Sequence, residues 1–135
     1  MLNAAIVGLG RWGQRLVESV STPPSSAVRF THAVVRTPAK AADFCKRHRL
    51  TVTSFETVLR EVDAVVLATP HSQHADQVVR AARAGKHVFV EKPFTLDVES
   101  ALAAAGACQQ AGVVLGLGHN RRFLPAVAQM REIIE

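Results

Sequence analysis

The chain opens with a short apolar run that leads straight into closely spaced glycines, and this pattern permits few folds. Residues 2–7, LNAAIV, have the composition of a buried strand. Gly8, Gly10 and Gly13 follow in the spacing G-x-G-x-x-G, and apolar residues then recur at helical intervals through 11–20. A strand, a glycine turn and a helix in this order predict the first unit of a parallel α/β sheet.

Each glycine in this turn has its own physical reason. At Gly8 the chain turns tightly off the strand, where a side chain would clash, and Gly13 allows the helix to lie against the strand. Gly10 allows the backbone to approach a pyrophosphate, which the N–H groups and dipole of the helix N-terminus attract. The turn is therefore predicted to bind a dinucleotide. Its candidate cofactor-binding residues are Gly8, Leu9, Gly10, Arg11, Trp12 and Gly13.

Strand and helix patterns alternate along the remaining chain. Further strands are predicted at 28–35, 50–53, 64–68, 87–90 and 113–117. Further helices are predicted at 38–48, 55–59, 72–84, 98–111 and 124–134, with a loop at 21–26. Thr37, Ser54 and Asp97 are candidate N-caps, and Gly85 and Gly112 are candidate stops. This alternation predicts an α/β fold, a doubly wound parallel-sheet Rossmann domain with three α/β/α layers.

Composition narrows the class of protein further. A chain of 135 residues with 48% apolar residues is long enough for one domain with its own core. The net charge of +5 raises the question of nucleic acid. However, the basic run 46–49 closes a predicted helix, where cations suit the dipole, and aromatic residues do not alternate with basic ones. We therefore expect no nucleic-acid partner.

The remaining composition predicts a cytoplasmic protein. The N-terminal residues do not resemble a signal peptide, and no apolar run approaches the about 18 residues of a membrane span. Cys45 and Cys108 lie in helical patterns without metal-ligand spacing, so we expect reduced thiols and no metal site.

Polar segments follow three of the predicted strands. They are 69–74 (TPHSQH), 91–93 (EKP) and 118–123 (GHNRRF). Because α/β sheets bind ligands at the carboxyl ends of their strands, these segments are expected to meet at one edge of the sheet.

With these motifs the chain resembles the N-terminal domain of the Gfo/Idh/MocA oxidoreductases, which include glucose–fructose oxidoreductase and inositol dehydrogenases. The resemblance is carried by 8–13 (GLGRWG), 68–70 (ATP) with His74, 84–93 (AGKHVFVEKP) and 121–125 (RRFLP). It extends over essentially the whole chain, and the segment that ends in EKP is its most specific part.

The resemblance implies NAD(P)-dependent hydride transfer on a sugar, polyol or related carbinol. It places Lys92 beside the nicotinamide, where an ammonium can hydrogen-bond the substrate oxygen or relay a proton. Lys92 is therefore the candidate catalytic residue, with an ordinary surface lysine as the alternative. The candidate cofactor-binding residues of this region are Thr69, Pro70, His71, His74, Glu91, Lys92 and Asn120. The alternatives are an exposed acid for Glu91 and a polar helix cap for His74.

The end of the second predicted strand departs from the common pattern. Rossmann domains often place there an acid that binds the ribose 2′-hydroxyl, whereas this chain has Arg36 and Thr37. A guanidinium suits a 2′-phosphate, so the expected cofactor is NADP or NAD, with NADP favoured. Alternatively, Arg36 stacks on the adenine of the cofactor, an arrangement that also occurs in NAD-binding proteins.

Members of this family continue into a C-terminal α/β substrate domain. We expect 1–120 to be the NAD(P)-binding domain and 121–135 to begin the connection to such a domain. The chain by itself is then expected to be inactive. The whole protein is expected to act on a sugar- or polyol-like substrate and to form a homo-oligomer. A non-catalytic sensing module and an unrelated Rossmann protein with another adenine cofactor remain open.

Overall fold

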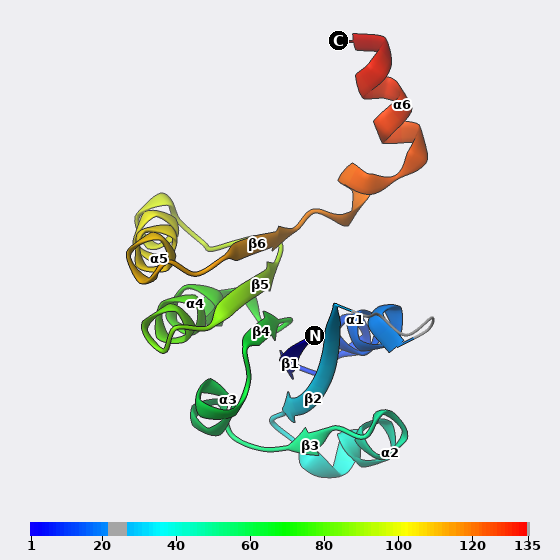
Figure 1. Cartoon of the computed structure of the whole chain (residues 1–135), viewed down its shortest axis with the longest axis vertical. Coiled ribbons are helices and arrows are strands. Elements are labelled where there is room, and N and C mark those ends of the chain that lie inside the picture. Colours follow the sequence, from blue (N-terminus) through cyan, green and yellow to red (C-terminus); the bar gives the residue numbers. More distant parts are fainter. Residues whose placement is uncertain (22–26, 135) are drawn as a thin grey trace.

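The computed structural model describes residues 1–21 and 27–134, so most of the predicted loop, 22–26, lies outside the described residues. Six strands form one parallel sheet in the order β3-β2-β1-β4-β5-β6 (Figure 1). The strands are β1 Leu2–Val7, β2 Val28–Val34, β3 Thr51–Val52, β4 Ala64–Leu67, β5 His87–Glu91 and β6 Leu115–Gly118. The order reverses between β1 and β4, which is the topology of a doubly wound Rossmann domain. The predicted fold class is confirmed.

Helices cover both faces of this sheet (Figure 1). They are α1 Arg11–Ser21, α2 Pro38–His48, α3 Phe55–Glu61, α4 His74–Arg83, α5 Val98–Ala111 and α6 Pro125–Ile134, with short 3-10 helices η1 His71–Gln73 and η2 Asn120–Phe123. One face is covered by α1 and α2 and the other by α3, α4 and α5, whereas α6 extends away from the sheet with no buried residue.

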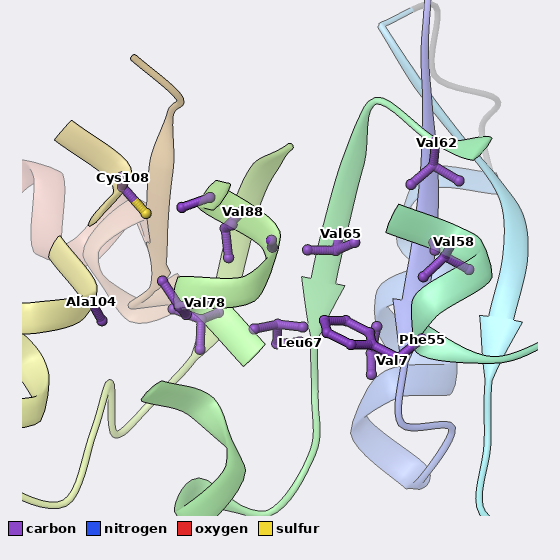
Figure 2. Packing of buried hydrophobic residues seen from close by; sticks show 14 residues of the cluster. Val7, Phe55, Val58, Val62, Val65, Leu67, Val78, Val88, Ala104 and Cys108 are labelled. Atoms are coloured by element: carbon purple, nitrogen blue, oxygen red, sulfur yellow. The ribbon is translucent and has the colours of Figure 1, made fainter. Parts of the chain in front are cut away.

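The alternation of side chains along β1 divides the core into two layers. Val7 points into the cluster under α3, α4 and α5, whereas Ile6 packs against α1 and α2. Figure 2 shows the first cluster, in which Leu67 of β4 lies between Phe55 of α3 and Val78 of α4. Because the last four residues of β1 and alternate residues of β4 are buried, the loops after these strands start from a fixed position.

Several predicted caps are confirmed. The side chain of Ser54 accepts a hydrogen bond from the Thr57 N–H at 3.1 Å, and that of Asp97 accepts one from the Ser100 N–H at 2.7 Å. The latter bond holds the pKa of Asp97 below its ordinary value. Gly112 ends α5 in the left-handed conformation, with φ 66°. Thr37 occupies the N-cap position of α2, but its side chain makes no capping hydrogen bond.

Some predicted boundaries were wrong, for local reasons. The helix expected at 72–84 is divided, because a Gln73 N–H to Pro70 O bond of 2.9 Å closes η1 before α4 begins. The strand expected at 113–117 starts two residues later, because the Val113 N–H instead bonds Cys108 O at the end of α5. At the sheet edge, β3 keeps only the residues paired with β2. Ser21, expected in a loop, ends α1.

Within 1–21 and 27–134, no helix is long and apolar enough to cross a membrane. Cys45 and Cys108 are free and buried, and burial raises the pKa of both thiols.

Candidate functional site

The glycine turn connects β1 to α1 at the carboxyl edge of the sheet. Gly8 has a φ of +95°, and a Cβ built on it would lie 2.6 Å from the carbonyl oxygen of Ala68, just past β4. A Cβ on Gly13 would collide with the carbonyl oxygen of Gly8. By contrast, a Cβ on Gly10 would have no atom within 4 Å. Two of the glycines therefore close the turn, and the third leaves open space beside the backbone.

The start of α1 suits an anion. The Gln14 N–H donates to Gly10 O at 3.0 Å, which makes Gly10 the residue from which the helix starts. The first N–H groups of a helix have no partner within it, and the first turn of α1 contains no acidic residue. Together with the open space at Gly10, the start of α1 provides the donors and the room that an anion needs.

Beside this turn lies a cleft of about 570 Å³. The predicted site residues that line it are Trp12, Thr69, His71, Glu91, Lys92 and Asn120. The cleft is also lined by Arg15, Ala68 and Arg121, which were not predicted as site residues. The cleft brings together the ends of β4, β5 and β6 with the first turns of α1, as the doubly wound topology requires.

The segment after β4 is held by α4. The Thr69 hydroxyl donates to Oε1 of Gln77 at 2.6 Å, and Nε2 of Gln77 donates to Oε1 of Gln73 at 3.3 Å. Gln77 is buried, so it fixes the Thr69 side chain at the cleft from behind. Pro70 is exposed at the start of η1.

His74 lies behind the cleft, fully buried. Its Nδ1 is 2.9 Å from the carbonyl oxygen of Pro93, and its Nε2 is 3.0 Å from that of Thr69. Both ring nitrogens thus lie within hydrogen-bond distance of a backbone carbonyl oxygen. The residue therefore ties the loop after β4 to the loop after β5. The interpretation as a cap of α4 is wrong, because Gln73 occupies that position.

Glu91 ends β5 at the cleft, and Lys92 directly follows it. Glu91 is only 9% exposed, which contradicts the alternative of an ordinary exposed acid. A Cβ on Gly118 of β6 would lie 2.8 Å from Oε1 of Glu91, so this glycine leaves room for the carboxylate. Lys92 is exposed and precedes a cis peptide bond to Pro93. Its ammonium is thus free to reach a ligand in the cleft.

Arg36 and Thr37 lie outside the cleft lining but next to the glycine turn. The Gly8 N–H donates to the carbonyl oxygen of Val34 at 2.9 Å, which holds the end of β2 against the turn. Arg36 follows two residues later and is exposed, as is Thr37 at the start of α2. The first turn of α2 contains no acidic residue.

The residues that were not predicted differ in the signal they carry. Arg15 lies three positions after Trp12, so the helical spacing of α1 places both on one face. Arg121 lies within the polar segment 118–123 that follows the sixth strand, but its position alone did not mark it as a cleft residue. Gln77 gives no local signal, because its role depends on the approach of α4 to the loop after β4.

A second hollow of about 450 Å³ lies between α4 and α5, away from the strand ends, and among its described lining residues only Arg83 is charged. Among the residues that the structure describes, no three His, Cys, Asp or Glu side chains gather as metal ligands would.

A parallel sheet of this order, with a glycine turn at its reversal point and a polar cleft beside it, defines a dinucleotide-binding Rossmann domain. The family described as "Oxidoreductase family, NAD-binding Rossmann fold" (GFO_IDH_MocA) matches residues 2–119. The chain belongs to this family.

Known relatives agree with this assignment. The UDP-N-acetylglucosamine 3-dehydrogenase of Acidithiobacillus ferrooxidans is 34% identical over 97% of this chain and 41% of its own length. The structure of Lactobacillus casei scyllo-inositol dehydrogenase with NAD(H) and scyllo-inositol superposes with a TM-score of 0.91 at 27% identity, over 99% of this chain and 41% of that one. A Desulfitobacterium hafniense protein classed as an NADPH-dependent oxidoreductase gives a TM-score of 0.89 at 29% identity, over 97% and 38%. The chain thus spans about two fifths of the length of these relatives.

Proposed function

We propose that this chain is the cofactor-binding part of an NAD(P)-dependent oxidoreductase that acts on a CH–OH group of a sugar, polyol or related carbinol. The observation that carries the proposal is the position of Lys92. Lys92 lines the same cleft as Trp12, which belongs to the glycine-turn helix. The inositol and UDP-sugar dehydrogenases among its relatives support the substrate class. A sensing module would not need the lysine, and none of the comparisons favours that alternative.

The residues of the chain fit a dinucleotide. We assign the pyrophosphate to the turn of Gly8, Gly10 and Gly13 with the start of α1, where nothing lies within 4 Å of a Cβ on Gly10. The backbone of Leu9 and Arg11 belongs to the same turn. Thr69, Pro70, His71 and Asn120 would line the ribose and nicotinamide side. When bound, the cofactor accepts or donates the hydride.

The ammonium of Lys92 would donate a hydrogen bond to the substrate oxygen, whose charge changes as the C–H bond breaks. Glu91, buried next to it in the chain, would hold the lysine or the cofactor ribose. His74 would act as a positioning residue, because its two carbonyl partners belong to the segments that carry Thr69 and Lys92.

For the cofactor we propose NADP rather than NAD. The end of β2 lies against the glycine turn and presents Arg36 and Thr37, with no acid at 34–37. The hydroxyl of Thr37 makes no capping bond to α2. Both groups therefore suit a 2′-phosphate, and the NADPH-dependent classification of one relative supports this assignment.

Wild-type chain is expected to bind NADPH about tenfold more tightly than NADH, because a charge-assisted contact contributes about 1.5–3 kcal/mol. Arg36→Asp should reverse this preference, since a carboxylate accepts from the ribose 2′-hydroxyl and repels the phosphate. Calorimetric titration of wild type and variant with each cofactor measures the ratio of the two Kd values. Lys46→Asp is the control, because it changes the net charge equally at the other end of α2. A wild-type preference for NADH would contradict the proposal.

The whole protein is proposed to have a second, substrate-binding domain, to which residues 121–135 begin the connection. This proposal is supported by the share of the relatives that the chain matches and by α6, which has no buried residue. Phe123 and Ile133, each 80% exposed, favour self-association of the chain alone. The free, buried cysteines fit a reducing, cytoplasmic location.

The chain is expected to bind NADPH and NADH, quenching the fluorescence of Trp12, its only tryptophan. It should turn over no sugar or polyol, because positioning contributes many powers of ten in rate and the cleft is open. The absorbance of reduced nicotinamide over a substrate panel measures turnover. Robust turnover would contradict the need for a second domain.

In a chain that includes that domain, Lys92→Ala should lower kcat/KM about a hundredfold, and an unchanged rate would remove Lys92 from the mechanism.

A further inference from the structure

Three cationic side chains line the cleft and come from different elements. Arg15 belongs to α1, Lys92 follows β5, and Arg121 lies in η2. Among the described residues of the same lining, Glu91 has the only carboxylate. Among the residues that the structure describes, none of these three cations has a hydrogen-bond or ion-pair partner for its side chain. The cleft therefore concentrates positive charge that the described part of the chain does not neutralise.

Such an arrangement is costly without an anion. Like charges around one concavity repel, and the low-dielectric walls of a cleft focus their field. By contrast, the half-buried Arg80 of α4 is paired with both Glu56 and Asp76. Unpaired cations converging on one cleft from three elements indicate that the missing negative charge belongs to a ligand.

The cofactor, as proposed above, does not supply this charge. Its pyrophosphate is assigned to the glycine turn and its 2′-phosphate to Arg36, which is not among the residues that line the cleft. The end of the dinucleotide placed beside Lys92 is the nicotinamide, which is neutral when reduced and carries a positive charge when oxidised. A second, negatively charged ligand is thus needed to neutralise the positive charge of Arg15 and Arg121.

We infer that the substrate is an acidic hydroxylated compound, one that carries a carboxylate or phosphate beside its carbinol, and that Arg15 determines this specificity. The inference rests on the proposed function and refines its substrate class. Lys92 would face the reacting oxygen, while the guanidinium groups of Arg15 and Arg121 bind the acidic group with two donors each. Trp12, 39% exposed in the same lining, offers an apolar surface to the carbon skeleton.

The test compares three sugars that differ in charge: glucuronate, glucose 6-phosphate and glucose. Each is titrated into the wild-type chain with saturating NADPH, and binding is followed by 15N NMR shifts of the Trp12 indole, which reports on the cleft alone because the chain has no other tryptophan. At least one of the two anions is expected to bind about tenfold or more tightly than glucose. The difference should shrink between about 20 mM and about 300 mM salt, because counterions screen exposed charges. The two anions identify the carboxylate or the phosphate as the preferred group.

Arg15→Gln and Arg121→Gln should each bring the affinity for the preferred anion to within about threefold of that for glucose. Arg60→Gln is the matched control, because it removes one charge from α3, away from the cleft lining. Circular dichroism verifies that every variant is folded, and two separate arginines keep the test informative if one variant is not.

The outcomes separate this inference from the proposed function. If NADPH binds and all three sugars bind alike, the acidic substrate is wrong and the proposed function stands. If Arg15→Gln and Arg121→Gln weaken NADPH instead of the anion, the arginines serve the phosphates of the cofactor and the inference is overturned. If neither NADPH nor NADH binds but the anions do, the proposed function fails and the anion site remains.

Discussion

Replacing Gly13 by alanine is expected to lower the free energy of unfolding by about 3 kcal/mol or more, at the upper end of the cost of overpacking. The added methyl group would collide with the carbonyl oxygen of Gly8, which is backbone held in the turn. The neighbouring side is also closed, because the Cβ would lie 3.6 Å from that of Ala68. To admit the methyl group, α1 has to move off the sheet and out of its contact through Val17. Thermal unfolding followed by circular dichroism measures the loss as a Tm lower by about 10 °C.

Gly106→Ala is the matched control for this prediction. It is the same substitution inside a helix, but a Cβ on Gly106 would have no atom within 4 Å apart from the local helix backbone. Because alanine has the higher helix propensity, this variant should be more stable than wild type by up to about 1 kcal/mol. Equal Tm values for Gly13→Ala and Gly106→Ala would show that the close approach at the turn does not govern stability.

Gly10→Val is expected to abolish dinucleotide binding while the fold survives. The open space at Gly10 accepts a side chain without a clash, but the valine would occupy the space through which a pyrophosphate reaches the backbone. Calorimetry should show the Kd for NADPH raised about a hundredfold or more, a loss of about 2.7 kcal/mol. The Tm should fall by only a few degrees, since glycine is replaced by a poorer residue at the start of α1.

Unchanged NADPH affinity in Gly10→Val would contradict the assignment of the pyrophosphate to this turn. The comparison with Gly13→Ala sharpens the test. One glycine of the fingerprint is expected to affect binding with little loss of stability, and the other is expected to affect stability first. A variant at Gly10 that unfolds would overturn the distinction drawn from the space around the two residues.

Much of the cofactor side was predictable from sequence because its signals are local. The spacing of the glycines indicates where two backbone segments, or a backbone segment and a ligand, come close together. The periodicity of apolar residues indicates strands and helices. The Thr69 and Glu91 segments were placed correctly at one edge, since parallel strands with helical crossovers present their carboxyl ends together. The close approaches at Gly8 and Gly13 and the doubly wound parallel sheet needed no distant contact to predict.

The role of His74 could not be read from its neighbours in sequence. Its partners are the carbonyl oxygens of Thr69 and Pro93, which are five and nineteen residues away. Local pattern indicated a residue at a helix start, which is equally compatible with an exposed cap. Only the approach of the loops after β4 and β5 made it a buried link between them.

The amino-acid sequence by itself determined the fold, the glycine turn and the edge of the sheet at which the polar segments gather, because these depend on local spacing and on the handedness of crossovers. The tertiary structure decided which side chains share the cleft. Arg15 and Arg121 are 106 positions apart and meet Lys92 there only because β1 lies two strands from β5 and β6 follows it in the sheet. Charge converging from separate elements is a property of packing, and no window of the sequence contains it.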